Sequence, residues 1–319
     1  MTMKKYIGLI GLILFLILLI KLNLFQIISI ISSANVFFIA LSFIPMLMVY
    51  FLKAFRWKTI LSSLKIQISF TDILIMSLIG YFYGSITPGN VGDFIRSKYL
   101  SNVNSIPLGE SFSTVFVERI FDLMVIFYIG FIGVLYLMTS YKIFLMPIYL
   151  LVLILIISIS FFYVVLNEKI LLIIIFSFFL KAVPKKYTQY IEHHINDFVN
   201  YLKLLITNKH LLIKITLLSI IIWLFACLGG YCLILSLGAP VSFPFIVCVM
   251  IISTLISLIP ISVNGLGTRE LTIISLFSII HLNPEFAFSF SVMVLAWILL
   301  SIIPGMILFF VCKKEYLTI

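Results

Sequence analysis

The stretch SITPGNVGDFIRSKYL, Ser85 to Leu100, interrupts an apolar region with helix-breaking and charged residues. The residues before it, DILIMSLIGYFYG, have the composition of a membrane helix. Pro88, two glycines, Asp93 and Arg96 then follow in close succession. Proline cannot continue a helix and glycine weakens one, so this pattern predicts that a helix ends here. Because charge is placed at the break, the break itself is a candidate functional feature.

The chain is too apolar for a water-soluble protein. Of its 319 residues, 63% are hydrophobic and 10% are charged, whereas soluble domains are about 25% charged. Runs such as IGLIGLILFLILLI are continuous, which excludes the alternating strands of a membrane β-barrel. The composition therefore predicts an all-α, polytopic membrane helical bundle that forms a single integral membrane domain over residues 1–319.

Apolar stretches of about 20 residues are long enough to cross a bilayer. Two further stretches, residues 71–86 and 243–282, are interrupted by proline and glycine and predict re-entrant hairpins of broken helix. The polar segment 181–214 has apolar residues at helical spacing and predicts an amphipathic cytoplasmic connector between two halves. Six full spans are predicted, at residues 6–28, 36–55, 111–138, 144–166, 215–237 and 286–311.

The net charge of +10 comes mainly from lysines between apolar stretches and is not the footprint of a nucleic-acid partner. Lysine and arginine are enriched in cytoplasmic loops. This bias is kept if residues 71–100 dip in from the cytoplasm and residues 243–282 from the outside. The sequence thus predicts a multi-pass plasma-membrane protein with both termini in the cytoplasm. The markers that place the end of the second span inside are Lys53, Arg56, Lys58 and Lys65.

The two interrupted stretches have similar tips. SITPGNVGDFIR (85–96) and SLIPISVNGLGTRE (257–270) each contain serine, proline, glycine, an acid and an arginine. Hairpins of opposite orientation suggest an inverted repeat, a transporter design in which broken helices meet near the bilayer midplane. Irregular backbone at that depth requires protein or a polar cavity around it. The predicted broken-helix tips are formed by Pro88, Gly89, Gly92, Pro260, Gly265 and Gly267.

Arginine is scarce, with four residues against 17 lysines, and three of the four lie beside an acid in apolar surroundings. Arginine binds phosphate or carboxylate through two parallel hydrogen bonds and keeps its proton. Helix N-termini at the breaks would add N–H groups that favour anions. The predicted substrate-binding residues are Arg96, Arg119, Arg269, Asn90 and Asn264.

Acids accompany these arginines, and we expect them to orient the arginines or to carry coupling protons. An unpaired charge at the bilayer centre costs at least about 2.5–3.5 kcal/mol. Two compatible interpretations of the third span stay open: Arg119 neutralises a neighbouring acid within the span, or the span lines a cavity beneath the Pro88 break. The acids in question are Asp93, Glu118, Asp122 and Glu270.

At these residues the sequence resembles the flippase-like transmembrane region of lysylphosphatidylglycerol synthases. The resemblance covers nearly the whole chain and rests on Arg56-Trp57, TPGNVGDFIR (87–96), VERIFD (117–122) and PISVNGLGTRE (260–270). The family also includes stand-alone membrane proteins. Its synthases carry a large soluble aminoacyltransferase domain, so we expect no lipid aminoacylation here. The resemblance implies lipid translocation or the handling of lipid-linked glycans.

The expected function is therefore a lipid translocase that binds an anionic phospholipid or a polyprenyl-phosphate-linked lipid. Two alternatives stay open: a membrane subunit of glycolipid synthesis with a glycosyltransferase partner, and a small-anion transporter. The sequence contains no GxSxG, HExxH, Walker A or CxxC motif. A transporter is thus favoured over an enzyme, and we expect neither a cofactor nor a metal site.

Overall fold

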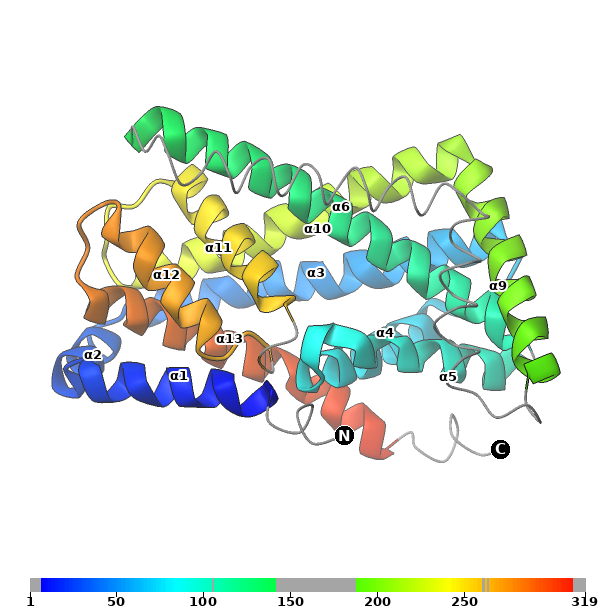
Figure 1. Ribbon diagram of the computed structural model, residues 1–319, viewed down its shortest axis with the longest axis horizontal. Coiled ribbons are helices and arrows are strands. Elements are labelled where there is room, and N and C mark those ends of the chain that lie inside the picture. The colour runs from blue at the N-terminus through cyan, green and yellow to red at the C-terminus, as the bar shows by residue number, and fades with distance from the viewer. Residues whose placement is uncertain (1–6, 105, 142–187, 260–261, 263, 312–319) are drawn as a thin grey trace.

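The computed structural model describes residues 7–104, 106–141, 188–259, 262 and 264–311, which form an α-helical bundle (Figure 1). Four helices there are long and apolar enough to cross a membrane, which confirms the predicted spans at 36–55, 111–138, 215–237 and 286–311. The predicted span at 144–166 lies outside the described residues. The four helices are α3 (Val36–Ser63), α6 (Leu108–Tyr141), α10 (Lys209–Ser236) and α13 (Pro284–Val311).

The predicted span at residues 6–28 is broken in the structure and is not one continuous helix. The chain instead forms α1 (Ile7–Lys21) and α2 (Leu24–Ser32), which are bent by 91° relative to each other. The side chain of Asn23 accepts the backbone N–H of Gln26 at 3.3 Å and so caps the start of α2. An N-cap residue has non-helical backbone angles, which is why the first helix cannot continue through Asn23.

Short polar side chains also set where other helices begin. Asn35 before α3, Ser69 before α4 (Phe70–Ile86) and Asn208 before α10 each accept a backbone N–H of the first turn, at 2.9, 3.1 and 3.1 Å. These bonds satisfy N–H groups that have no partner within the helix. The long apolar runs are therefore divided by single capping residues.

Two hairpins of shorter helix complete the bundle. The helix α4 leads through a 3-10 turn, η2 (Pro88–Phe94), into α5 (Ile95–Asn104). The second hairpin consists of α11 (Phe243–Ser257) and α12 (Thr268–Ser278). In Figure 1 the two hairpins start from opposite ends of the bundle and their tips face each other near its middle. The predicted breaks after residue 86 and within 243–282 are confirmed.

The packing of the two hairpins is reciprocal. The helix that follows the first hairpin, α6, packs against α11 of the second. The helix that follows the second hairpin, α13, packs against α4 of the first. The helices that precede the hairpins, α3 and α10, pack against each other. Such an exchange of partners is the arrangement that an inverted repeat requires.

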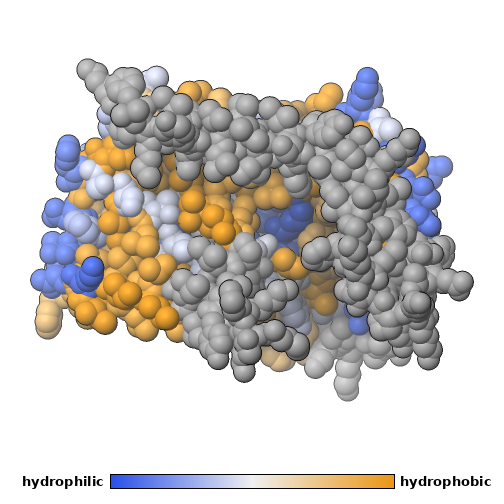
Figure 2. Space-filling view, in the orientation of Figure 1, coloured by the Kyte–Doolittle hydropathy of each residue, from blue (hydrophilic) through white to orange (hydrophobic). Residues whose placement is uncertain are grey.

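The polar connector contains α9 (Thr188–Thr207), which lies across one end of the bundle (Figure 1). Its apolar face packs against α6 and buries Ile195, Phe198, Leu202 and Leu205, which the sequence places on one helical face. Between the two ends, the long helices expose large apolar side chains such as Leu217, Leu300 and Ile307. Figure 2 shows mostly hydrophobic atoms along the middle of the molecule, with a hydrophilic patch in a central hollow, and hydrophilic atoms at its two ends, as expected for a protein in a bilayer.

A candidate anion site between the hairpin tips

A cavity of about 360 Å³ lies where the two hairpin tips meet. Gly89 and Asn90 of η2 line one side, and Asn264 and Arg269 of the second hairpin line another. The walls between these polar groups are mostly apolar. They include Met46, Val49, Phe116, Ile126, Ile222 and Val294, from α3, α6, α10 and α13.

The backbone turns at both tips through a glycine and an asparagine with positive φ angles. Gly89 and Asn90 have φ angles of 65° and 56°, and Asn264 and Gly265 have φ angles of 51° and 73°. Glycine and asparagine are the residues that adopt this left-handed conformation at low cost. The order of the pair is reversed between the tips, and in each pair the asparagine lines the cavity. The predicted tip residues Gly89 and Gly265 are thus explained by backbone geometry.

The first tip is held against its own helix. The hydroxyl of Thr87 accepts the backbone N–H of Gly92 at 2.7 Å and donates to the carbonyl of Tyr83 at 2.9 Å. Gly92 approaches that carbonyl so closely that a Cβ atom would clash with it. Pro88 is the first residue of η2, where a missing N–H costs nothing.

The second tip is held against α1. A Cβ atom on Gly267 would clash with the backbone carbonyl of Gly11. The two segments therefore approach each other so closely that glycine is required at this contact. Glu270 accepts the backbone N–H of Gly267 at 2.5 Å and thereby closes the start of α12. The remaining predicted tip residue, Pro260, lies outside the described residues.

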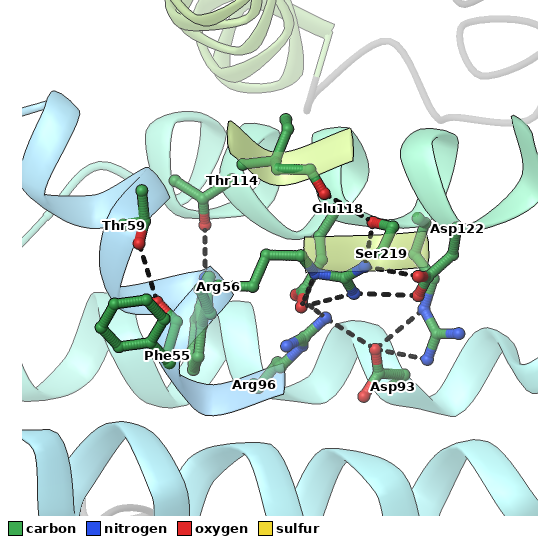
Figure 3. Close-up of polar contacts among 12 residues, drawn as sticks. Phe55, Arg56, Thr59, Asp93, Arg96, Thr114, Glu118, Asp122 and Ser219 are labelled. Atoms are coloured by element: carbon green, nitrogen blue, oxygen red, sulfur yellow. Dashed lines mark hydrogen bonds and ion pairs between the residues drawn. The ribbon is translucent and has the colours of Figure 1, made fainter. Parts of the chain in front are cut away.

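A buried charge network joins the first hairpin to α3, α6 and α10 (Figure 3). Arg56 lies at its centre with 1% of its surface exposed. Its guanidinium contacts Glu118 at 2.8 Å, Asp122 at 2.5 Å and the hydroxyl of Ser219 at 2.5 Å. Arg56 does not lie in a loop after the second span, because α3 continues to Ser63 and keeps this arginine buried inside the bundle.

Asp93 forms the other half of the network, at the end of η2. One of its oxygens lies 2.9 Å from Arg96 and 2.5 Å from Arg119. Arg96 also contacts Glu118 at 2.5 Å, and its guanidinium carbon lies 4.8 Å from the centre of the Trp57 ring. Arg119 therefore forms its ion pair with an acid of the hairpin.

The structure separates the predicted substrate-binding residues into two groups. The cavity is lined by Arg119, Arg269, Asn90 and Asn264. Arg96 is not among the lining residues, and its side chain is 5% exposed between Asp93 and Glu118. Of the predicted acids, Asp122 reaches the cavity wall.

Arg269 lines the cavity and carries hydrogen-bond donors that have no partner. Its Nη2 donates to Glu270 at 2.6 Å, but its Nε and Nη1 are buried without a hydrogen-bond partner. The indole Nε1 of Trp223, which also lines the cavity, is buried without a partner as well. Buried polar groups are almost always hydrogen-bonded. Three unpartnered donor nitrogens on two residues that line one cavity therefore indicate a place for a ligand with oxygen acceptors.

The sequence prediction missed Lys53, which lines the cavity and whose ammonium lies 5.0 Å from the centre of the Tyr81 ring. It also missed Arg56 and Trp223 as parts of the site. A signal existed for α3, because Tyr50, Lys53 and Arg56 recur every three residues and so share one flank of a helix. The basic residues of the cavity, set in apolar walls, suit an amphiphilic anion.

The fold and the cavity define a multi-pass helical membrane protein. The chain belongs to the family described as "Lysylphosphatidylglycerol synthase TM region", which it matches over residues 7–305. It is 27% identical to a UPF0104 membrane protein of Methanocaldococcus jannaschii over 96% of this chain and 94% of the relative. A UPF0104 membrane protein of Pyrococcus horikoshii is 25% identical over 90% of each chain. Another, from Methanothermobacter thermautotrophicus, is 24% identical over 84% of this chain and 81% of the relative.

Proposed function

We propose that this protein binds an anionic phospholipid or a polyprenyl-phosphate-linked lipid by its phosphate and moves it across the membrane. One observation carries the proposal: the buried Nε and Nη1 of Arg269 have no partner at a cavity between two opposed hairpin tips. Arginine is the side chain best suited to phosphate oxygens. The phosphate would receive these donors, and Arg119 and Lys53 would add positive charge beside it.

The walls of the cavity favour a lipid over a small anion. Side chains such as Met46, Ile222 and Val294 offer nothing to an inorganic anion but match the acyl or prenyl chain of a lipid. The family description names lysylphosphatidylglycerol, which is itself a phospholipid. Both facts support a lipid substrate.

The opposed hairpins favour translocation over static binding. In transporters with inverted repeats, broken helices from the two halves meet at the substrate, and one half moves against the other. Here α6 and α13 cross over to pack against the opposite hairpin, so a movement of either hairpin is transmitted to the other half. The sequence has no Walker A motif. The drive would come from an ion gradient, the membrane potential or the lipid gradient.

The orientation follows from the lysines at the two ends of the bundle. The end where α9 lies carries Lys58, Lys65, Lys98, Lys203, Lys209 and Lys214, by their positions in α3, just after α3, and in α5, α9 and α10. The positive-inside bias places this end in the cytoplasm. The first hairpin then enters from the cytoplasm and the second from outside. Both termini would lie in the cytoplasm, and the protein would reside in the plasma membrane.

Reconstitution tests this function. Liposomes that contain the purified protein and a trace of fluorescent phospholipid are treated with dithionite, which bleaches only the outer leaflet. We expect the protein to expose the inner-leaflet lipid to bleaching, whereas protein-free liposomes keep about half of their fluorescence. Uptake of an inorganic anion without movement of lipid would instead select the small-anion transporter and refute the proposal.

A further inference from the structure

The arginines and acids in the cavity wall and directly behind it balance each other in number. Each of the four acids, Asp93, Glu118, Asp122 and Glu270, lies within ion-pair distance of at least one arginine. Four arginines take part in these pairs, namely Arg56, Arg96, Arg119 and Arg269. The network, including the Arg269 pair, therefore contributes no net charge to the cavity.

Lys53 adds a positive charge that forms no ion pair with any acid among the described residues. Its ammonium lies over the ring of Tyr81, and in the described part of the chain no carboxylate comes within ion-pair distance of it. Because Lys53 lines the cavity, the cavity carries a single excess positive charge when this lysine is protonated. A buried charge without a partner is costly, so a ligand with one negative charge would complete the site.

The unpartnered donors indicate which atoms of the ligand face the protein. Nε and Nη1 of Arg269 lie on different edges of one guanidinium, because Nη1 is on the side of Cδ, so each can donate to a separate oxygen acceptor. Nε1 of Trp223 offers a third donor at the same cavity. A phosphodiester has two free oxygens and a single negative charge, whereas a phosphomonoester above its second pKa of about 6 carries nearly two charges.

We propose that the cavity selects lipids whose head group is joined through a phosphodiester with a net charge of minus one, and that Lys53 sets this charge. This inference rests on the proposed function and narrows its substrate class. Phosphomonoester and diphosphate lipids would bring one more negative charge than the cavity can balance. Zwitterionic lipids would leave Lys53 beside a head group of no net charge.

Binding of short-chain lipids tests, separately from transport, the proposed preference for head groups with a net charge of minus one, which we call the charge rule. Dihexanoyl phosphatidylglycerol is a monoanionic phosphodiester, dihexanoyl phosphatidic acid is a phosphomonoester, and dihexanoyl phosphatidylcholine is a zwitterion. Each lipid is titrated into the purified full chain, and its affinity is measured. The titration is done at about pH 8, because at this pH the phosphomonoester is close to doubly charged. We expect the wild type to bind phosphatidylglycerol at least about tenfold more tightly than the other two, which corresponds to about 1.4 kcal/mol.

Two substitutions identify the residue that sets the charge. We expect Lys53→Met to lose the roughly tenfold preference and Lys53→Arg to keep it, with Lys209→Ala as the surface control. If Lys53→Met does not fold, Lys53→Gln serves as the second variant. Equal binding of phosphatidic acid and phosphatidylglycerol by the wild type, or an unchanged preference in both neutral variants, would overturn the inference.

The outcomes separate this inference from the proposed function. Selective binding of phosphatidylglycerol without lipid movement in liposomes would refute the translocase and leave the charge rule intact. Lipid movement without any discrimination between head groups would support the translocase and refute the charge rule. Glycerophosphoglycerol, the same head group without acyl chains, should bind more weakly, because the apolar walls then have nothing to contact. Equal affinity would contradict the lipid substrate alone.

Discussion

Arg119 directs both its Nε and its Nη2 at the same oxygen of Asp93, at 2.9 and 2.5 Å. The arginine belongs to α6 and lines the cavity, whereas the aspartate belongs to the tip of the first hairpin. A ligand phosphate in the cavity can therefore compete with Asp93 for Arg119. Under the proposed function, this competition would be a physical route by which a bound ligand loosens the hairpin.

The Arg119–Asp93 pair should show strong coupling in a double-mutant cycle. Asp93→Asn and Arg119→Gln each leave buried charge without its partner, and each should lower the free energy of unfolding by about 3 kcal/mol. The double variant removes both charges of the pair and should be more stable than the sum of the two losses predicts. Thermal unfolding in detergent measures all three. Strictly additive losses would show that the two residues do not interact.

Arg56 should tolerate no conservative replacement. Its planar guanidinium contacts Glu118, Asp122 and Ser219 together, and a lysine ammonium cannot span the three partners. We expect Arg56→Lys to lower the free energy of unfolding by roughly 2 kcal/mol, the size of a lost hydrogen bond to a charged group. Lys209→Arg, at an exposed position, is the matched control. An Arg56→Lys variant as stable as this control would contradict the assigned contacts.

The left-handed tip of the first hairpin can be tested against a glycine of similar conformation elsewhere. Gly89 and Gly238 have φ angles of 65° and 74°, and neither would meet a neighbour closer than 3.7 Å through a new Cβ atom. Alanine at either position should cost about 1 kcal/mol of stability from backbone strain. Only Gly89→Ala should also slow lipid movement, because only Gly89 lines the cavity. Equal rates of lipid movement in both variants would show that the conformation of the first tip has no role in transport.

The orientation predicts which end of the bundle a membrane-impermeant maleimide can reach in intact cells. Ser62 and Asn283 are exposed at opposite ends, one beside the α9 end of α3 and the other just before α13. With the native cysteines replaced by alanine, Asn283→Cys should be labelled in intact cells and Ser62→Cys only after the cells are opened. The reverse pattern would invert the proposed topology.

Much of this architecture could be predicted from the sequence because the signals are local. Apolar length gave four spans, and proline with glycine located both hairpin breaks. The bend at Asn23 was missed because a single capping residue hardly changes the hydropathy of an apolar stretch. A capping residue acts through one hydrogen bond, which an average over 20 residues does not register.

The candidate site was predicted in part, and its gaps have one cause. Arg119 and Arg269 stood out because arginine is scarce and both lie beside acids. Arg56 and Lys53 were taken for cytoplasmic markers because hydropathy placed the end of α3 too early. The pairing of Arg56 with α6, and of Arg119 with η2, depends on contacts between distant segments. Spacing along one helix cannot show such contacts.

The most direct test of the central claim is the rate of lipid movement in liposomes that contain wild type, Arg269→Gln or Trp223→Phe, each checked for thermal stability. We expect fast movement by the wild type and at least about tenfold slower movement by Arg269→Gln, the loss expected when about 1.4 kcal/mol of stabilisation is removed from the transition state of lipid movement. Trp223→Phe, which removes one donor, should lie between the two. Equal rates for wild type and a folded Arg269→Gln would contradict the phosphate site at the hairpin tips.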